Sequence, residues 1–324
     1  MSELTPDLSI IIVSWNVRDL LARCLESITA GWGDFASFPE AMEVIVVDSA
    51  SSDGSAAMVA ARFPWVRLIA LDENAGFTAG NNIGLRASRG RHVMLLNPDT
   101  EVIGDALAQM VRYLDAHPDV GAVGPHTLGS DGATQSTRRR FPTLATALFE
   151  STWLQPYAPR RLLDRYYVVG PPDDATLDVD WVQGSALMVR RAAYAQVGGL
   201  DEGYVMYSEE MDWCRRIKAV GWRVVYLGSA QIVHHGGKSS EQVTARRHIY
   251  FNASKVRYFR KHHGRLAAEA LRAVLLLNFA WQLALEGAKY VIGHRRDLRR
   301  ARIGAYWQVL RSGLKTPARK ARDG

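Results

Sequence analysis

The sequence predicts an α/β protein, with a mixed, mostly parallel sheet flanked by helices and a C-terminal helical extension. Through the first 125 residues, apolar runs rich in β-branched residues alternate with segments of helical period, and this alternation is typical of a parallel sheet. Three of the apolar runs end in polar turns. Beyond residue 260 the sequence changes to a long helical stretch with many basic residues.

Five strands are expected in the first half, each as a short apolar run bounded by turn residues. They cover residues 8–16, 42–48, 66–71, 92–96 and 120–125. Helical spacing of apolar residues predicts helices between them, at residues 17–30, 56–63, 83–90 and 106–118. The first two strands are almost continuously apolar, as expected of strands that are buried on both faces.

The second half is less regular. Residues 144–180 are expected to be irregular, because they combine prolines and aromatic residues without a clear period. A strand at 179–191, a short helix at 192–204, a helix at 209–221 and a strand or strand pair at 222–235 are expected to follow. A last long helix is expected at residues 266–293.

The bulk composition is that of an ordinary globular protein. With 324 residues, 48% of them hydrophobic, the chain can bury a large core as one domain or as one domain with an appendage. The two cysteines, Cys24 and Cys214, lie in predicted helices and imply no disulfide framework. The first ten residues lack a basic region followed by an apolar core, so no signal peptide is expected and a reducing cytoplasm fits best.

The net charge is +7, and much of the excess lies in residues 294–302 and 315–324. Such a basic end suits an anionic membrane surface, a phosphorylated substrate or a nucleic acid, or it is simply a solvated terminus. No nucleic-acid-binding module is recognisable, so no nucleic-acid partner is expected. Residues 273–285 are free of charge but too few to span a bilayer. They favour an interfacial helix with peripheral membrane contact, or a helix packed on the rest of the protein.

Polar residues follow three of the predicted strands at the point where each strand ends. They are Ser14 and Asn16, Asp48 and Ser49, and Asn97 with Asp99. In a parallel sheet the carboxyl ends of the strands lie at one edge, where ligands bind. These side chains are therefore expected to share a site.

Asp99 is a candidate ligand for Mg²⁺ or Mn²⁺, because such cations are usually bound by few carboxylates together with substrate phosphates. The alternative is a turn aspartate, since Asn-Pro-Asp turns are common. Asp48 could accept a hydrogen bond from a nucleobase or a ribose hydroxyl, or it could cap the next helix. For Asp53 the cap is the favoured interpretation.

The loop that begins near Asn74 is rich in glycine, which lets backbone approach a ligand closely. The chain has neither a GxGxxG fingerprint nor a P-loop motif. Their absence argues against a dinucleotide enzyme and against a P-loop NTPase.

The acidic cluster of Glu209, Glu210 and Asp212 opens a predicted helix. Adjacent residues there point in different directions, so not all three are expected at one site. One could act as a general base, because crowding by like charge raises a carboxylate pKa; the alternative is a solvated helix start. His234 and His235 are also adjacent, so at most one of them is expected to join a metal site.

Seven segments occur in an order that resembles one family. They are "SIIIVSWN", "VIVVDSASSDGS", "NAGFTAGNNIGL", "LLNPDT", "WVQGSALMVRR", "GGLDEGYVMYSEEMDWCRR" and "HHGGKSS". Over roughly residues 8–260 the chain resembles the inverting family 2 glycosyltransferases, whose GT-A fold is a Rossmann-like mixed sheet. Within that family it is most similar to the rhamnosyltransferase-like branch. Each motif alone is weak, whereas the ordered set is highly specific.

The resemblance implies a nucleotide-diphosphate sugar donor, a divalent cation (Mg²⁺ or Mn²⁺) and direct displacement at the anomeric carbon. The nucleotide-binding residues it implies are Val13, Ser14, Asn16, Asp48, Ser49, Asn74 and Asn97. Phosphate binding is expected at Arg139 and Arg140, which could instead belong to a basic surface loop. Acceptor binding is expected at Trp181, Gly184 and Ser185.

The family's Asp-x-Asp metal motif corresponds to Asn97-Pro98-Asp99, in which asparagine replaces the first aspartate. Asp99 remains the expected metal ligand, together with His234. The family's catalytic base lies in an acidic pair that maps to Glu209 and Glu210. Glu210 is the expected base and Glu209 the alternative.

The expected function is transfer of a sugar, best guess from dTDP-L-rhamnose, to a lipid-linked or polysaccharide acceptor of a bacterial cell-surface glycan. The alternatives are another donor (a UDP-hexose or galactofuranose) or a catalytically idle membrane-associated binding protein. A nucleotidyltransferase would need a basic glycine-rich loop near the first strand, which is missing. The transferase domain is expected at 1–260, with a nucleotide-binding half to residue 125, and the extension at 261–324. The expected location is the cytoplasm, at the inner face of the cell membrane.

Overall fold

A computed structural model describes residues 5–31, 42–150, 152–236 and 244–315. These residues form two compact units that interleave along the sequence. The first unit comprises the described parts of Met1–Phe141, Tyr167–Asp201 and Glu210–Ser239, and the second those of Pro142–Tyr166, Glu202–Glu209 and Ser240–Gly324. The domain division at residue 260 stays a prediction.

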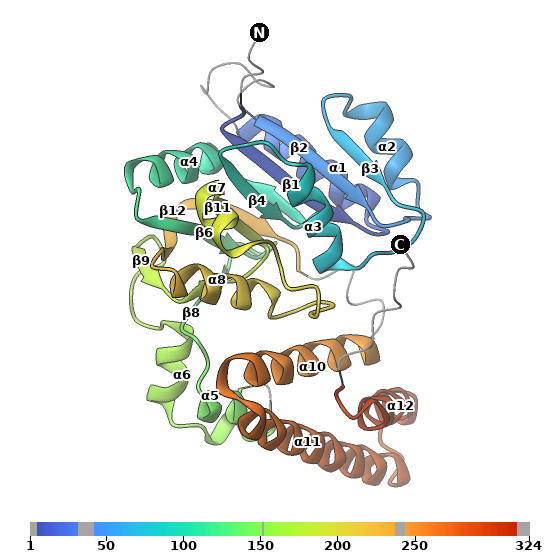
Figure 1. Ribbon diagram of the computed structural model, residues 1–324. Helices are drawn as coiled ribbons and strands as arrows, with labels where there is room; N and C mark the ends of the chain where they lie inside the picture. Colours follow the sequence, from blue (N-terminus) through green and yellow to red (C-terminus); the bar gives the residue numbers. More distant parts are fainter. Residues whose placement is uncertain (1–4, 32–41, 151, 237–243, 316–324) are drawn as a thin grey trace. The chain divides into compact units, whose positions relative to one another are not determined.

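The first unit is built on a mixed sheet (Figure 1). Its strands are β1 (Leu8–Ser14), β2 (Met42–Asp48), β3 (Arg67–Ala70), β4 (His92–Leu96), β5 (Thr100–Val102), β6 (Val120–Leu128), β7 (Thr134–Gln135), β9 (Thr176–Val179), β11 (Ala186–Arg190) and β12 (Arg223–His234). The strand order is β3-β2-β1-β4-β11-β6-β12-β5, with β7 beside β6 and β9 beside β12. A separate antiparallel pair joins β8 (Arg138–Arg139) to β10 (Trp181–Val182).

Strands β3, β2, β1 and β4 run parallel, as the alternating pattern predicted. Strand β11 then runs antiparallel to both β4 and β6, while β6 and β12 are parallel again. The predicted mixed α/β fold is therefore confirmed. Its parallel half carries the three polar strand ends.

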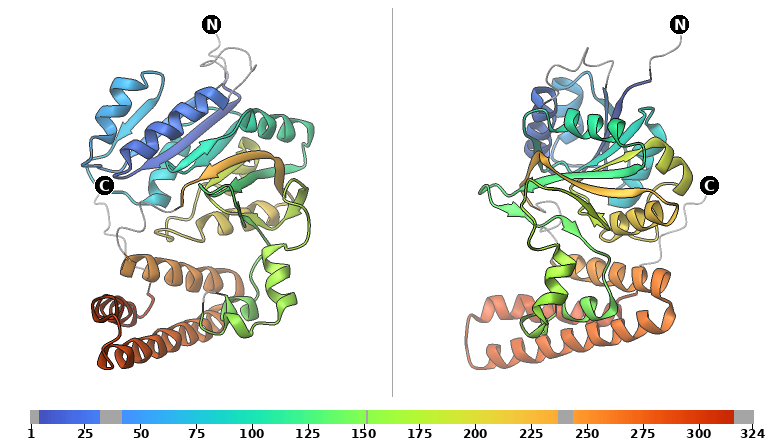
Figure 2. Two further views of the ribbon diagram at one scale, coloured as in Figure 1. Left: turned by 180° about the vertical axis from the view of Figure 1, so that it is seen from behind. Right: turned by 90° about the vertical axis from the view of Figure 1, so that its left-hand side faces the viewer.

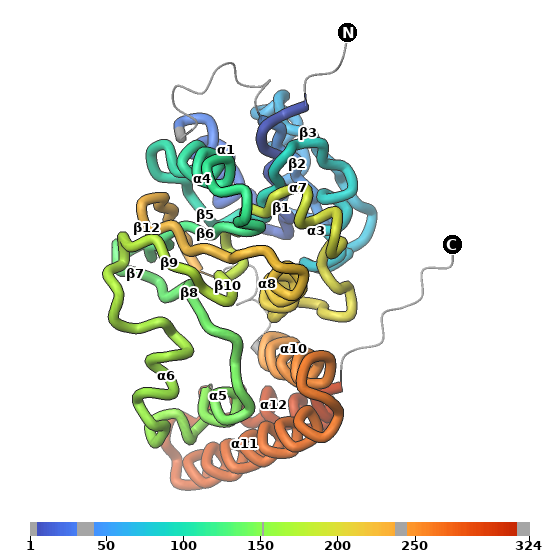
Figure 3. The backbone as a smooth tube through the Cα atoms, turned by 60° about the vertical axis from the view of Figure 1, so that its left-hand side comes forward, coloured from blue at the N-terminus to red at the C-terminus, as the bar shows by residue number. Residues whose placement is uncertain are grey.

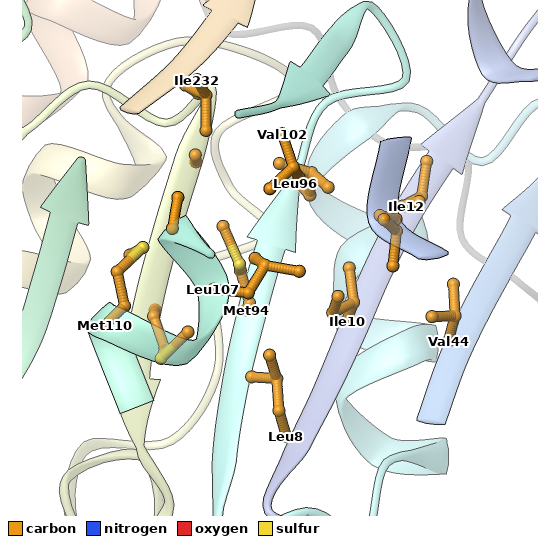
Figure 4. Close-up of a cluster of buried hydrophobic side chains, with 14 of the residues drawn as sticks. Leu8, Ile10, Ile12, Val44, Met94, Leu96, Val102, Leu107, Met110 and Ile232 are labelled. Carbon is orange, nitrogen blue, oxygen red and sulfur yellow. The ribbon is translucent and has the colours of Figure 1, made fainter. Parts of the chain in front are cut away.

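Helices lie on both faces of this sheet (Figure 2). They are α1 (Arg18–Gly31), α2 (Ser55–Arg62), α3 (Phe77–Ala87), α4 (Ala106–Ala116), α7 (Arg191–Val197) and α8 (Glu209–Ala219). Ile10 and Ile12 of β1 join the main core with apolar residues of α1 and α4 (Figure 4). Val13 packs in a smaller core with residues of α3. Burial of each such side chain stabilises the fold by about 1.5–3 kcal/mol. Because β1 contributes side chains to both cores, both of its faces are apolar.

Several predicted elements differ from the structure. The single strand expected at 179–191 is divided, because the backbone leaves β10 at Gln183, whose amide donates to the Thr137 carbonyl over 2.9 Å. The strand or strand pair at 222–235 is one strand, β12, with an irregularity between Leu227 and Gln231. The described part of residues 144–180, expected to be irregular, contains two short α-helices, a 3₁₀ turn and β9.

The second unit is helical. It contains α5 (Leu144–Phe149), a 3₁₀ turn (Gln155–Tyr157), α6 (Arg160–Tyr167), α10 (Thr244–His263), α11 (Arg265–Val291) and α12 (Arg296–Ser312). Helices α10, α11 and α12 pack against one another (Figure 3). A buried ion pair between Glu286 and Arg299, with a shortest distance of 2.7 Å, ties α11 to α12.

Helix α11 is long and apolar enough, by length and composition alone, to cross a membrane. The expectation that residues 273–285 are too few to span a bilayer concerns a shorter stretch than this helix of 27 residues, and it stays a prediction. The core helix of a soluble protein passes the same test. The basic residues beyond Lys315 lie outside the described part of the chain.

Both cysteines are free and buried, Cys24 in α1 and Cys214 in α8. Cys24 Sγ lies 3.7 Å from the Asn97 carbonyl oxygen, behind the turn that follows β4.

Gly84 lets α3 approach β1 closely, and its replacement by alanine is expected to lower the free energy of unfolding by about 1–3 kcal/mol. A Cβ at this position would lie 2.3 Å from Ile11 Cγ2, in a packed interior. Urea unfolding followed by circular dichroism measures the effect. Gly304→Ala in α12 is the control, since nothing lies within 4 Å of its Cβ and a helical alanine stabilises by roughly 0.5–1 kcal/mol. Equal midpoints for the two variants would contradict the close approach.

Candidate active site

The polar residues that end β1 and β2 lie together at one edge of the sheet. Ser14 pairs with Asp48 in the parallel register of the two strands, and the Ser49 amide donates a hydrogen bond to the Ser14 carbonyl over 2.9 Å. Among the described residues, Ser14 Oγ, Asp48 Oδ1 and Ser49 Oγ are buried and have no hydrogen-bond partner. A buried polar group left without a partner costs about 1–3 kcal/mol, so their clustering points to a polar ligand at this edge.

The loop after β2 is held by its own side chains. Asp48 Oδ2 accepts a hydrogen bond from the Ser51 amide over 2.9 Å. Asn16 Oδ1 accepts one from the Ser52 amide over 2.8 Å, and the Asn16 amide donates to Ser51 Oγ over 3.0 Å. Asn16 therefore braces this loop, and its contact with a nucleotide stays a prediction.

Asp53 accepts hydrogen bonds from the first amide of α1 and the first amide of α2, although Gly54 and not Asp53 holds the N-cap position of α2. Its Oδ2 accepts from the Arg18 amide over 2.8 Å, and its Oδ1 accepts from the Ser55 amide over 3.0 Å. Burial alone would raise the pKa of Asp53, but hydrogen bonds from Ser55 and Arg18 outweigh it and hold the pKa below its usual value. This carboxylate serves the fold.

The Asn97-Pro98-Asp99 turn follows β4 and is held on both sides. The Asn97 amide donates to the Ser185 carbonyl over 2.9 Å, and the Asp99 carbonyl accepts from the His235 amide over 2.9 Å. Asn97 Oδ1 is buried and has no hydrogen-bond partner within the described ranges. The turn thus adds another buried polar atom to those of β1 and β2.

Asp99 and His234 face each other at this turn. Asp99 is 5% exposed, and His234 Nε2 lies 3.4 Å from Asp99 Oδ1. His235 lies instead 2.7 Å from Glu101, which confirms that the two adjacent histidines diverge. A buried carboxylate beside an imidazole nitrogen fits a divalent cation such as Mn²⁺ or Mg²⁺. No cluster of three or more metal-binding side chains occurs in the part of the chain that the structure describes, and the metal-binding roles of Asp99 and His234 stay predictions.

Glu210 lies beside the segment that supports Asn97. A Cβ at Gly184 would lie 3.3 Å from both Cβ and Cγ of Glu210, and Gly184 directly precedes Ser185, whose carbonyl binds the Asn97 amide. The missing side chain at Gly184 therefore lets Glu210 pack against this backbone. Gly184 thus allows close packing of Glu210. The expected contact of Gly184 with an acceptor is not tested and stays a prediction.

The other acidic residues of α8 have different surroundings. Glu209 is buried, with 4% of its surface exposed. Asp212 is fully buried and pairs with Arg216 Nε over 2.8 Å. Arg216 also donates to the carbonyls of Val197 and Gly199. Asp212 therefore stabilises the fold, as expected if the three carboxylates cannot all serve one site.

The backbone directly before Glu209 is strained. Tyr207 has a φ of 71° and Ser208 a φ of 65°, both in the left-handed region that costs a residue other than glycine about 1–3 kcal/mol. Strain of this kind clusters at functional sites. Here the two strained residues directly precede Glu209, the first residue of α8.

The predicted arginine pair and Trp181 have partners within the protein. Arg139 donates to Ser136 Oγ over 2.8 Å, and Arg140 Nη1 lies 3.7 Å from Asp180 Oδ1. The Trp181 indole donates to the Arg140 carbonyl over 3.0 Å, and the residue is buried. The phosphate-binding and acceptor-binding roles of these residues stay predictions.

Asn74 orders the exposed loop before α3. Its Oδ1 accepts a hydrogen bond from the Gly76 amide over 2.8 Å. Gly76 has a φ of 77° and directly precedes the first residue of α3. This turn explains the Asn-x-Gly spacing, and a nucleotide contact for Asn74 stays a prediction.

Two residues near the site carried no motif in the sequence. Asp180 accepts hydrogen bonds from Lys218 Nζ over 2.7 Å and from the Phe141 amide over 2.9 Å. Burial alone would raise the pKa of Asp180, but these two bonds hold it below its usual value. Gln135 binds His234 at two points. The contacts of Asp180 and Gln135 are with residues far away in the sequence, so the sequence pattern alone gives neither residue a role.

Comparison with known proteins gives consistent results. Residues 9–173 match the family model described as Glycosyl transferase family 2. The chain is 29% identical over 248 residues to the N-acetylglucosaminyl-diphospho-decaprenol L-rhamnosyltransferase of Mycobacterium tuberculosis, and the match covers 73% of this chain and 78% of that protein. It is 25% identical over 203 residues to the rhamnosyltransferase WbbL of Escherichia coli, covering 56% and 69%.

The fold also occurs in solved structures, of which two are given as examples. The mannosyltransferase PcManGT from Pyrobaculum calidifontis, in complex with GDP-Man and Mn²⁺, gives a TM-score of 0.55 at 20% identity and covers 95% of this chain and 85% of that one. GalNAc-T7 with UDP, GalNAc and Mn²⁺ gives a TM-score of 0.53 at 16% identity and covers 70% and 42%. At these identities the likeness supports the fold alone.

Proposed function

The chain belongs to glycosyl transferase family 2 and is a glycosyltransferase, and from this premise we propose that it inverts the anomeric carbon of a nucleotide-diphosphate sugar. The observation that carries the proposal is the group of buried polar atoms without partners at the ends of β1, β2 and β4, in the described part of the chain. They lie at the edge where a parallel sheet binds ligands.

The donor is proposed to be dTDP-L-rhamnose, because two of the relatives are named as rhamnosyltransferases. The acceptor is proposed to be a hydroxyl of a glycan or of a lipid-linked saccharide, since the name of one relative specifies a diphospho-decaprenol acceptor. The product would enter a cell-surface glycan. A UDP-hexose or galactofuranose donor is the alternative within the same fold.

The nucleotide would bind at the strand ends. Asp48 Oδ1 would accept a hydrogen bond from the base or the ribose, and the hydroxyls of Ser14 and Ser49 would donate to the nucleotide or accept from it. Asp99 and His234 would hold a divalent cation. When bound there, the cation neutralises charge on the diphosphate.

Glu210 is proposed as the general base. It would accept the proton of the acceptor hydroxyl while that oxygen bonds to the anomeric carbon and the bond from this carbon to the diphosphate breaks. Arg139 and Arg140 are proposed to donate hydrogen bonds to the leaving diphosphate, a form of electrostatic stabilisation. Glu209 is the alternative base.

The direct test is calorimetric donor binding, with and without Mn²⁺, across dTDP-rhamnose, UDP-galactose, UDP-glucose and GDP-mannose. Metal-dependent binding of one donor, followed by sugar transfer or slow hydrolysis of that donor, supports the proposal and names the sugar. If a donor binds but is neither transferred nor hydrolysed, the result favours the alternative of a catalytically idle binding protein, whose membrane association is tested separately.

Peripheral contact with the inner face of the cell membrane is proposed for the second unit. Leu277, Trp281 and Leu285 recur at four-residue spacing on α11 and are 69%, 51% and 38% exposed. Trp153 is 47% exposed, and its ring centroid lies 6.3 Å from that of Trp281. Exposed tryptophan and leucine side chains on one helix face are typical of interfacial membrane contact.

Replacing Leu277 and Trp281 together by serine is expected to weaken binding to anionic vesicles at least about tenfold, because burial of each apolar side chain contributes roughly 1.5–3 kcal/mol. Co-sedimentation with phosphatidylglycerol-containing vesicles measures the loss. Val169→Ser is the control, because Val169 is exposed in the first unit. If the double variant and the control bind the vesicles equally, this face of α11 does not make the membrane contact.

A further inference from the structure

Gln135, on β7, makes two hydrogen bonds to His234, which lies 99 residues further along the sequence. The Gln135 side-chain amide nitrogen donates to the His234 carbonyl oxygen over 2.8 Å. Its side-chain oxygen lies 3.0 Å from His234 Nδ1. One side chain thus binds both the backbone and the ring of the same histidine.

These two contacts determine which ring nitrogen carries the proton. A backbone carbonyl can only accept a hydrogen bond, so the NH₂ group of Gln135 must face it and Oε1 must face the ring. Oε1 can also only accept, so His234 Nδ1 must carry a hydrogen. In the neutral imidazole the lone pair then lies on Nε2.

Nε2 is also the nitrogen that faces Asp99. It is buried, makes no hydrogen bond within the described residues, and lies 3.4 Å from Asp99 Oδ1. In the neutral imidazole, a lone pair on Nε2 and a carboxylate oxygen only 3.4 Å apart repel each other unless a proton or a metal cation lies between them. Metal-binding histidines usually donate their other ring N–H to such an oxygen, which fixes the tautomer and the ring orientation.

We propose that Gln135 is a positioning residue that locks His234 in the Nδ1–H tautomer and thereby presents Nε2 to a divalent cation shared with Asp99. The inference rests on the proposed function for the identity of the site. It adds a residue on which metal affinity depends although it does not touch the metal.

The test replaces Gln135 by methionine, which has nearly the same shape but neither an amide donor nor a carbonyl acceptor. Long-range ¹H–¹⁵N spectra of the full-length protein report the tautomer of His234, with His234→Gln used to assign its signals. The wild type is expected to show the Nδ1–H form and Gln135→Met a shift toward the Nε2–H form. Titration with Mn²⁺ alone, followed by broadening of the His234 signals, is expected to show about 10–100-fold weaker binding in the variant.

Gln109→Met in α4 is the matched control, because that glutamine binds Asp105 on its own helix, and it should leave tautomer and metal affinity unchanged. An unchanged tautomer in Gln135→Met, unchanged Mn²⁺ affinity, or no broadening of His234 in the wild type would each overturn the inference. Sugar transfer by the wild type is scored separately. Absence of sugar transfer would count against the proposed function and not against the positioning of His234 by Gln135.

Discussion

Glu210→Gln is expected to lower the turnover number about 10²–10⁴-fold, the usual contribution of general-base catalysis. Glutamine keeps the shape of the side chain that packs against Gly184 but cannot accept the proton of the acceptor hydroxyl. The donor dissociation constant should therefore stay within about twofold of wild type. Transfer to acceptor under saturating donor measures turnover, and calorimetry measures donor binding.

Glu209→Gln is the control, since it changes the neighbouring carboxylate in the same way. A larger loss of turnover in this variant than in Glu210→Gln would identify Glu209 as the base. Turnover near wild type in both would refute catalysis by the acidic pair. Asp212→Asn separates folding from catalysis, because it breaks the buried pair with Arg216 and should lower the melting temperature.

Asp99→Ala is expected to abolish metal-dependent donor binding, with affinity falling at least about 100-fold. Loss of a residue that only supports a metal ligand already costs about 10–100-fold, and Asp99 is proposed as the ligand itself. Calorimetry with Mn²⁺ and the donor identified by the panel measures the loss. Binding without metal should change little, because Ser14 and Asp48 would still hold the nucleotide.

Glu101→Ala provides a matched control for this variant. Glu101 is a carboxylate two residues further along, and it lies beside the other histidine, His235, at 2.7 Å. Metal-dependent binding should survive its removal. If Asp99→Ala keeps normal metal-dependent binding, Asp99 is a turn residue, and its carboxylate has no part in holding the donor.

The parallel half of the fold and the shared edge of polar residues could be predicted because both depend on local pattern. The strand that ends at Ser14 and the strand that ends at Asp48 are continuous apolar runs followed by polar turns. Parallel topology then places their ends together without further information. The contact of Asp53 with the start of α2 is predictable for the same reason, since its partner Ser55 is two residues away.

The other features depend on contacts between distant segments. The chain leaves β10 at Gln183, whose amide binds the Thr137 carbonyl. The spacing of apolar residues along the sequence gives no sign of this contact. Gln135 lies in a short polar stretch, and only the position of His234 gives it a role. The sequence predicts that Arg139 and Arg140 bind phosphate. It does not show that Arg139 contacts Ser136 and that Arg140 lies near Asp180.

The burial of both cysteines has a chemical consequence. Burial raises the pKa of Cys24 and of Cys214 to about 12, and the thiolate is the reactive form. At pH 7 both buried thiols therefore stay protonated. The folded chain therefore presents no nucleophilic sulfur to alkylating reagents or mild oxidants. A single cysteine introduced on the surface would become its one labelling position, with both native thiols left in place.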